Sequence, residues 1–215
     1  MNTPARYRTW LRAFSPLLVG IALAGCALSG RPDAPPVATF VLQGNTTTSA
    51  ASGAATGLVL QVATPTAAPA YASSQMAYIE QPYRIDYFAR NEWADPPSRM
   101  LKTALTQQLT NSGLFRFVVS DSAGVDEALR LDSELMELVQ AFDESSSQVR
   151  VAIRFDLVDV VQRTILFSET ISASEPAARE PYAGVVAANT ALQRVLDQLV
   201  TQLRDPVTLL QPSKP

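Results

Sequence analysis

The chain has 215 residues, with 17 basic and 20 acidic side chains and a net charge of −3. It contains no histidine, which excludes a Ser-His-Asp triad and removes both the usual general base and the usual zinc ligand. A basic excess that would indicate nucleic-acid binding is absent. Neither lysine, Lys102 or Lys214, lies in a glycine-rich phosphate-binding loop, so an ATPase is excluded.

Residues 1–25 have the pattern of a signal peptide. A start with three arginines and no acidic residue is followed by an apolar run over residues 14–24. A membrane-spanning helix needs about 20 apolar residues, and Pro16 and Gly20 shorten this run further. We therefore expect a cleaved processing signal over 1–25 and not a membrane-spanning anchor.

The stretch Leu23-Ala24-Gly25-Cys26 resembles the bacterial lipobox. In that resemblance the Cys26 thiol receives a diacylglyceryl group, the chain is cut before Cys26, and a fatty acid such as palmitate acylates the new amine. Two or three acyl chains make a lasting membrane anchor, whereas one chain holds only reversibly. The alternative is an ordinary signal peptide whose cleavage region happens to contain this cysteine.

The residue after the cysteine is Ala27 and not aspartate. By the sorting rule that accompanies the resemblance, this favours the periplasmic face of the outer membrane. The covalent lipid on Cys26 is the only non-protein group that we expect, with no other cofactor and no metal ion.

The mature chain is long enough for one domain with a sizeable core. Residues 26–36 are small and proline-rich, as in a tether. We expect the folded domain over 37–206 and a flexible tail over 207–215.

The first half of the domain predicts strands and one helix. Strands are expected over 38–43 and 58–63, then a hairpin or one bent strand over 75–81 and 83–90, because Pro82 separates them. Asp95 can cap a helix that begins at Pro96 and Pro97 and ends at Asn111-Ser112-Gly113. A strand over 115–120 follows.

The second half of the domain contains longer runs in which apolar and polar residues alternate. Residues 128–142 favour a strand, although Leu131, Leu135 and Leu138 also fit one face of a helix. Residues 148–159 alternate strictly and predict an antiparallel hairpin with 128–142, continued by a strand over 164–174. A last helix over 181–205 should stop at Pro206. The pattern predicts an α+β fold, with a mainly antiparallel sheet and two main helices packed on one face.

Three carboxylates, Asp132, Glu134 and Glu137, are the remaining candidates for catalysis. They alternate with leucines in the expected strand, so a solvated strand face explains them more simply. We expect no catalytic residue and no enzyme activity.

The region 76–119 carries a resemblance to a known family. An aromatic strand ends in Arg90 close to Trp93, an acidic residue and prolines open a helix, and Ser112-Gly113 precedes Phe115. These elements resemble the ABC-type transport auxiliary lipoproteins, over about residues 37–204. The chain departs from the commonest pattern at Glu92, where many relatives carry a basic residue.

The resemblance implies a non-catalytic lipoprotein that serves an MCE-type lipid transport system. Its partners would be a periplasmic MCE protein together with an inner-membrane permease and ATPase. The resemblance is also compatible with a homo-oligomer. The alternatives are a periplasmic lipid-binding chaperone, with a lipid groove between helix and sheet, and an outer-membrane assembly lipoprotein of unrelated machinery.

Arg90, Glu92 and Trp93 are the candidate partner-binding residues. Arg90 and Trp93 could form a cation–π pair at a protein contact. In the other interpretation, Trp93 packs between the strand and the helix that follows and is structural.

Overall fold

The computed structural model of the protein describes residues 35–44, 56–120 and 128–210. The expected signal peptide, Cys26 and most of the expected tether lie outside the described residues. In the described part, the strands in chain order are β1 (Ala38–Phe40), β2 (Thr56–Val62), β3 (Thr66–Ala67), β4 (Gln75–Gln81), β5 (Arg84–Trp93), β6 (Phe115–Val119), β7 (Leu129–Phe142), β8 (Ser147–Asp159) and β9 (Thr164–Ala177). The helices are a short 3-10 turn, η1 (Pro69–Tyr71), and two long helices, α2 (Pro97–Asn111) and α3 (Pro181–Leu209).

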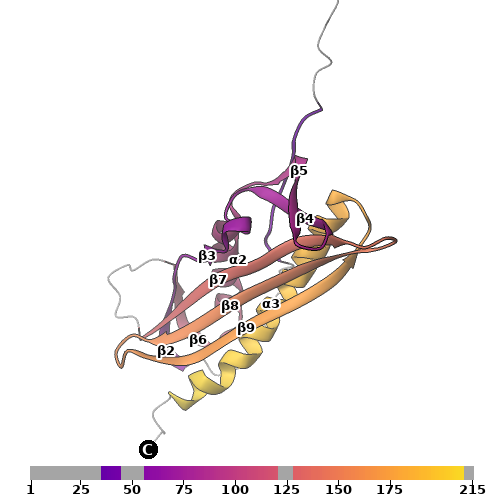
Figure 1. The fold of residues 1–215 in the computed structure, drawn as a ribbon. Coiled ribbons are helices and arrows are strands. Elements are labelled where there is room, and N and C mark those ends of the chain that lie inside the picture. The colour runs from indigo at the N-terminus through magenta and orange to yellow at the C-terminus, as the bar shows by residue number, and fades with distance from the viewer. Residues whose placement is uncertain (1–34, 45–55, 121–127, 211–215) are drawn as a thin grey trace, which may run out of the picture. The chain divides into compact units, whose positions relative to one another are not determined.

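Strand β7 is the centre of the sheet (Figure 1). Along one edge it pairs in parallel with β2 near its start, with β3 in its middle and with β4 near its end. Along its other edge it pairs antiparallel with β8, which in turn pairs with β9. Strand β6 extends the sheet beside β2, and β5 and β1 extend it beside β4.

The expectation of a mainly antiparallel sheet is wrong, because the sheet is mixed. Among the described residues, five strand pairings are parallel: β1–β5, β2–β6, β2–β7, β3–β7 and β4–β7. The three antiparallel pairings, β4–β5, β7–β8 and β8–β9, join strands that follow one another along the chain. Short turns reveal these hairpins in the sequence. Parallel partners lie far apart in the chain and leave no local signal.

Helix α2 follows the predicted course but begins without the predicted cap. Its buried residues recur at helical spacing: Met100, Leu101, Ala104, Leu105 and Leu109. The N-cap is Pro96 and no side chain caps the helix, while Asp95 instead pairs with Arg99 at 3.4 Å. Gly113, at φ 64°, takes the chain out of the helix in a conformation that glycine adopts without strain.

Helix α3 is longer than predicted, since Pro206 lies inside it and the helix ends at Leu209. A proline removes one intrahelical hydrogen bond and normally breaks a helix. Here Val207 is fully buried in the core, and its packing keeps the last turn in place. The expected tail over 207–215 therefore begins with three helical residues.

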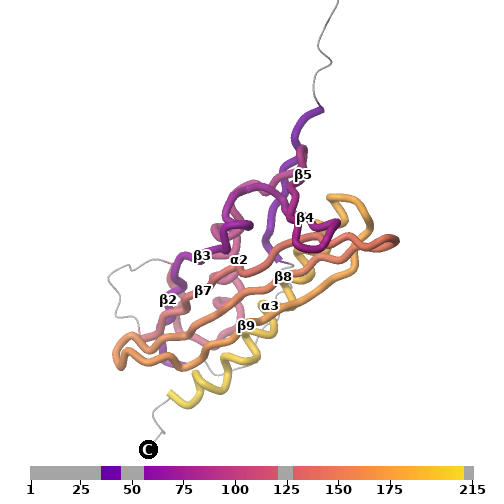
Figure 2. Tube along the Cα trace, viewed as in Figure 1, coloured from indigo at the N-terminus to yellow at the C-terminus, as the bar shows by residue number. Residues whose placement is uncertain are grey.

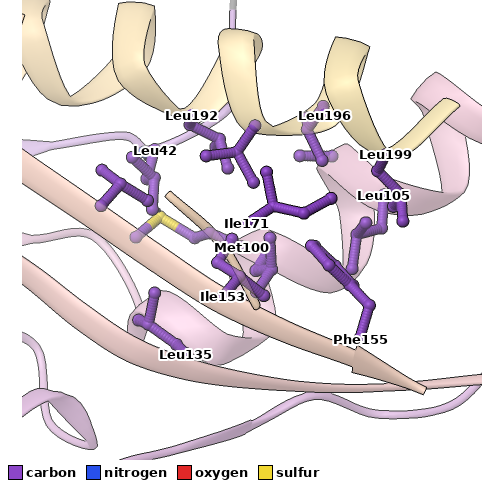
Figure 3. Packing of buried hydrophobic residues seen from close by; sticks show 14 of the residues in the cluster. Leu42, Met100, Leu105, Leu135, Ile153, Phe155, Ile171, Leu192, Leu196 and Leu199 are labelled. Atoms are coloured by element: carbon purple, nitrogen blue, oxygen red, sulfur yellow. Dashed lines mark hydrogen bonds between the residues drawn. The ribbon is translucent and has the colours of Figure 1, made fainter. Parts of the chain in front are cut away.

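One hydrophobic core lies between the helices and the sheet (Figure 3). Strand β8 turns alternate side chains inward, as the sequence predicted: Val149, Val151, Ile153, Phe155 and Leu157. They meet the leucine stripe of α3, in which Leu192, Leu196 and Leu199 are at most 1% exposed. The tube in Figure 2 shows α3 running along β8 and β9, consistent with its many contacts to both strands.

Candidate docking surface

The carboxylates that were candidates for catalysis lie in ion pairs on the side of the sheet away from the core. Asp132 pairs with Arg130 at 2.9 Å, Glu134 with Arg154 at 2.8 Å and Glu137 with Arg150 at 2.7 Å. Each carboxylate is thus neutralised by an arginine on its own strand or the adjacent one. Such cross-strand pairs stabilise a hydrated sheet face, and the arrangement offers no paired acid and base.

Two groups near this face have shifted pKa values. Burial raises the pKa of the Tyr71 phenol, and the nearby Glu137 carboxylate raises it further. A side-chain hydrogen bond to Asp132 raises the pKa of the Arg130 guanidinium. Both shifts favour the protonation state that each group already has at neutral pH, so neither group is prepared for proton transfer.

The three candidate partner-binding residues are divided between surface and core. Arg90 and Glu92 are exposed on β5, whereas Trp93 is only 4% exposed. Within the described residues, the two cation–π contacts are Arg116 with Phe117 and Arg179 with Phe142. The cation–π pair considered for Arg90 and Trp93 is not among these contacts, and the burial of Trp93 agrees with its structural interpretation.

Trp93 lies at the seam between the sheet and α3. It lines a cavity of about 20 Å³ together with Phe88 of β5, Leu138 of β7 and Ala188 of α3. A cavity of this size holds one water molecule at most. Lipid binding would require an apolar cavity of several hundred Å³, and the described part of this seam is filled by side chains.

A buried polar contact at the same seam was not found from the sequence. Gln140 of β7 donates hydrogen bonds to the Ser147 hydroxyl at 3.0 Å and the Ala178 carbonyl at 3.1 Å. Its amide oxygen faces Gly184, where an added Cβ atom would lie 2.2 Å away. Gly184 therefore permits the close approach of α3 to β7. A polar residue inside a strand expected to be buried was the only sequence signal for this contact.

A second unpredicted contact fastens α3 to β9. Arg194 Nη1 lies 2.6 Å from Glu175 Oε1, and the Glu175 side chain is only 10% exposed. The arginine side chain is 63% exposed and covers the carboxylate from outside. This ion pair holds the helix over the last strand of the sheet.

Strand β9 is an open edge of the sheet. In the described residues it pairs only with β8, and Figure 1 shows it as the outermost strand, with α3 on one side. Its side chains from Ser168 to Ser174 include one charged residue, Glu169. An unpaired edge of 14 residues can add a strand from another chain.

Among the described residues, no cluster of three or more acidic or cysteine side chains could hold a metal ion. No helix within these residues is sufficiently long and apolar to cross a membrane.

A mixed sheet that is covered on one face by two long helices defines a two-layer α+β domain. The sequence matches the model of the ABC-type transport auxiliary lipoprotein component over residues 40–203. This match spans most of the chain, and the chain therefore belongs to that family. The family resemblance drawn from the sequence is thereby confirmed.

Solved structures share this fold. Protein XCC0632 from Xanthomonas campestris, described as a DUF330 protein, is 18% identical, with a TM-score of 0.66 over 81% of this chain and 94% of that chain. A second protein, described only as uncharacterized, is 14% identical, with a TM-score of 0.62 over 78% of this chain and 99% of that chain. At these identities the likeness establishes the fold alone. No curated protein matches the sequence.

Proposed function

We propose that the protein is an accessory lipoprotein of an MCE-type lipid transport system, anchored to the periplasmic face of the outer membrane through Cys26. The observation that carries this proposal is the family match from the end of β1 to the last turns of α3. The lipobox at residues 23–26 supplies the anchor, and Ala27 after it favours the outer membrane.

Docking, and not catalysis, is the mode of action that we propose. The candidate carboxylates are held in ion pairs with arginines. The seam between α3 and the sheet leaves a cavity of only about 20 Å³, which excludes a lipid molecule from this place. A domain of this kind acts through a surface contact that is made while it is held at the membrane.

The free edge of β9 is the surface that we propose for the MCE protein. Backbone groups along an unpaired edge can bind an extended segment of a partner through main-chain hydrogen bonds. A weak contact is sufficient, because membrane anchorage of both proteins raises their effective concentration.

Site-specific photocrosslinking in cells tests this proposal. A photoreactive residue is placed at Thr170 or Ser172, both exposed on β9, and at Met136 on the ion-paired face as the matched control. We expect the two β9 positions to capture the periplasmic MCE protein and Met136 to capture none.

Other outcomes separate the alternative functions. Capture of unrelated envelope proteins alone, together with lipid transport that persists after gene deletion, would favour the assembly-lipoprotein alternative. Phospholipid that co-purifies with the protein beyond the covalent lipid of Cys26 would favour the chaperone alternative.

A further inference from the structure

Two uncharged segments of the domain expose apolar side chains side by side. Residues 37–43 and 181–193 contain no charged residue. The N-terminal apolar patch, as we name it, consists of Val37, Phe40, Val41, Tyr182 and Val186. Four of these are at least half exposed: Val37 at 50%, Val41 at 51%, Tyr182 at 66% and Val186 at 52%.

Contacts between the two segments make the patch one surface. The rings of Phe40 and Tyr182 lie 6.1 Å apart. Asn189 of α3 donates a hydrogen bond from Nδ2 to the Val41 carbonyl at 3.1 Å. Its Oδ1 accepts from the backbone N–H groups of Gln43 and Gly44 at 2.9 and 3.1 Å. The chain after β1 is therefore fixed along the first turns of α3.

The exposed members of the patch are not needed for the core. Leu42 and Val185, which neighbour Val41 and Val186 in the chain, point inward and are 2% and 7% exposed. Charged residues border the patch: Arg179 and Glu180 precede the helix, and Arg90 and Glu92 lie on β5 beside β1. Exposed valines beside a tyrosine, without charge, are typical of a surface that meets the boundary between lipid and water.

The length of chain between this patch and Cys26 indicates which surface the patch contacts. Val37 follows Cys26 by eleven residues, so the connection can span at most about 40 Å even when fully extended. The patch contains the point at which the chain from the lipid-bearing residue joins the domain. The surface within reach of an acylated Cys26 is the bilayer that holds its acyl chains.

The other end of the sheet also exposes apolar side chains, in a turn that includes the exposed charged residue Arg163. The turn between β8 and β9 exposes Val161 at 78% and Ile165 at 65%. Register places Asp159 opposite Leu129 at the start of β7, whereas β4 and its neighbour β5 join the sheet near the end of β7 (Figure 1). A strand of 14 residues separates the two ends by roughly 40 Å.

We propose that the N-terminal apolar patch rests on the bilayer that holds the Cys26 lipid. The domain then stands with the β8–β9 turn directed away from the membrane, and the β9 edge extends toward the periplasm. This inference depends on the lipid anchor of the proposed function and adds an orientation to it. A weak contact of a few side chains suffices, because the anchor already confines the domain to the surface.

Fluorescence quenching in proteoliposomes tests the orientation. The mature lipoprotein is reconstituted with an environment-sensitive fluorophore on Val186→Cys or, as the matched control, on Ile165→Cys at the opposite end. Acylated Cys26 does not react with the label. Nitroxide-labelled phosphatidylcholine should quench the fluorophore at position 186 at least threefold more strongly than at 165.

A charge placed in the patch provides the second measurement. Tyr182→Glu, at a side chain that is 66% exposed, should leave the fold intact and reduce quenching at position 186 at least twofold. Ile165→Glu should leave quenching at 186 unchanged. Circular dichroism spectra of both variants verify folding.

Equal, weak quenching at positions 186 and 165 in a protein whose Cys26 is acylated would overturn the orientation and leave the proposed function in place. A blue-shifted emission at 186 without lipid quenching, together with disulfide crosslinks between two copies of Val186→Cys, would assign the patch to a second copy. An unacylated Cys26 in mass spectrometry would instead overturn the anchor of the proposed function and this inference with it.

Discussion

Gly184 and Trp93 decide how closely the first turns of α3 approach the sheet. Both line the cavity of about 20 Å³ at the seam. The glycine provides space for the Gln140 side chain, whose amide is held by two hydrogen bonds, and the tryptophan fills the space beside it. Because the seam is close-packed, it requires the smallest residue at position 184 and a large one at position 93.

Gly184→Ala should destabilise the protein. Alanine favours a helix by up to about 1 kcal/mol over glycine, but its Cβ would lie 2.2 Å from Gln140 Oε1. Overpacking costs about 1–3 kcal/mol, so we expect a net loss of about 1–2 kcal/mol in the free energy of unfolding. Urea denaturation measures it.

Gly57→Ala is the matched control for this prediction, since an added Cβ at Gly57 meets no atom within 4 Å. Its effect should stay within about 0.5 kcal/mol. Equal effects of the two substitutions would contradict the close-approach argument.

Trp93→Ala should lower the free energy of unfolding by about 3–5 kcal/mol, as truncations of large buried aromatic residues do. The reason is its burial, at 4% exposure, between β5 and α3. Thermal and urea denaturation measure the loss, with Phe117→Ala, at a side chain that is 56% exposed, as the control. Unchanged melting together with lost partner binding would show that Trp93 acts at an interface.

Strand β9 is stabilised by its packing against α3. It pairs with one strand only in the described residues, and α3 packs along it. The Arg194–Glu175 ion pair adds a polar contact between the two elements. The helix thus stabilises an edge strand whose free side remains available for pairing.

Arg194→Met should weaken this attachment. The substitution leaves the Glu175 carboxylate largely buried without its charged partner, and removing one partner of a buried ion pair is destabilising. Because the arginine is 63% exposed, water can replace part of that contact, and we expect a loss of about 1–2 kcal/mol.

Arg204→Met, at an exposed arginine of the same helix, is the control and should change stability by less than about 0.5 kcal/mol. Amide hydrogen exchange should place the Arg194→Met effect in β9 and the middle of α3. A loss spread evenly over all strands would argue against a local attachment.

At the scale of the whole molecule, the two ends of the sheet differ in their connection to the N-terminal segment. One end bears the N-terminal apolar patch, where the chain from Cys26 joins the domain, and the other bears the β8–β9 turn. The free β9 edge runs between them. The proposed membrane anchor, whose chain joins the domain at Val37, and an open edge along the side suit a protein that acts by contact.

Cys26→Ser should abolish lipid attachment, because serine lacks the thiol that forms the thioether with diacylglycerol. The signal peptide should then stay uncleaved by the lipoprotein route. Mass spectrometry of the N-terminus measures both effects. Ala27→Ser, which retains the thiol, is the control and should be acylated. A wild-type chain that begins elsewhere than at Cys26 would refute the lipoprotein assignment for this residue.

Much of the local structure could be predicted from the sequence by itself. Alternation over 148–159, helical spacing in 100–109 and the Ser112-Gly113 stop depend on neighbours in the chain, so β8 and the course of α2 were predicted correctly, although α2 lacks the predicted Asp95 cap. The motif around Trp93 was sufficient to identify the family, and the family match over residues 40–203 confirms it. Such features are determined by side-chain periodicity and turn chemistry, which are local properties.

Only the tertiary structure decided which strands pair in parallel, where α3 ends and which polar groups meet. Strand β7 contacts β2, β3 and β4 across long separations, Val207 keeps α3 helical beyond Pro206, and Gln140 faces Gly184 from another element. Arg90 is exposed and Trp93 is buried in the core, although they are only three residues apart. These outcomes follow from packing between segments that are distant in sequence, and the free energy of that packing overrides local preference.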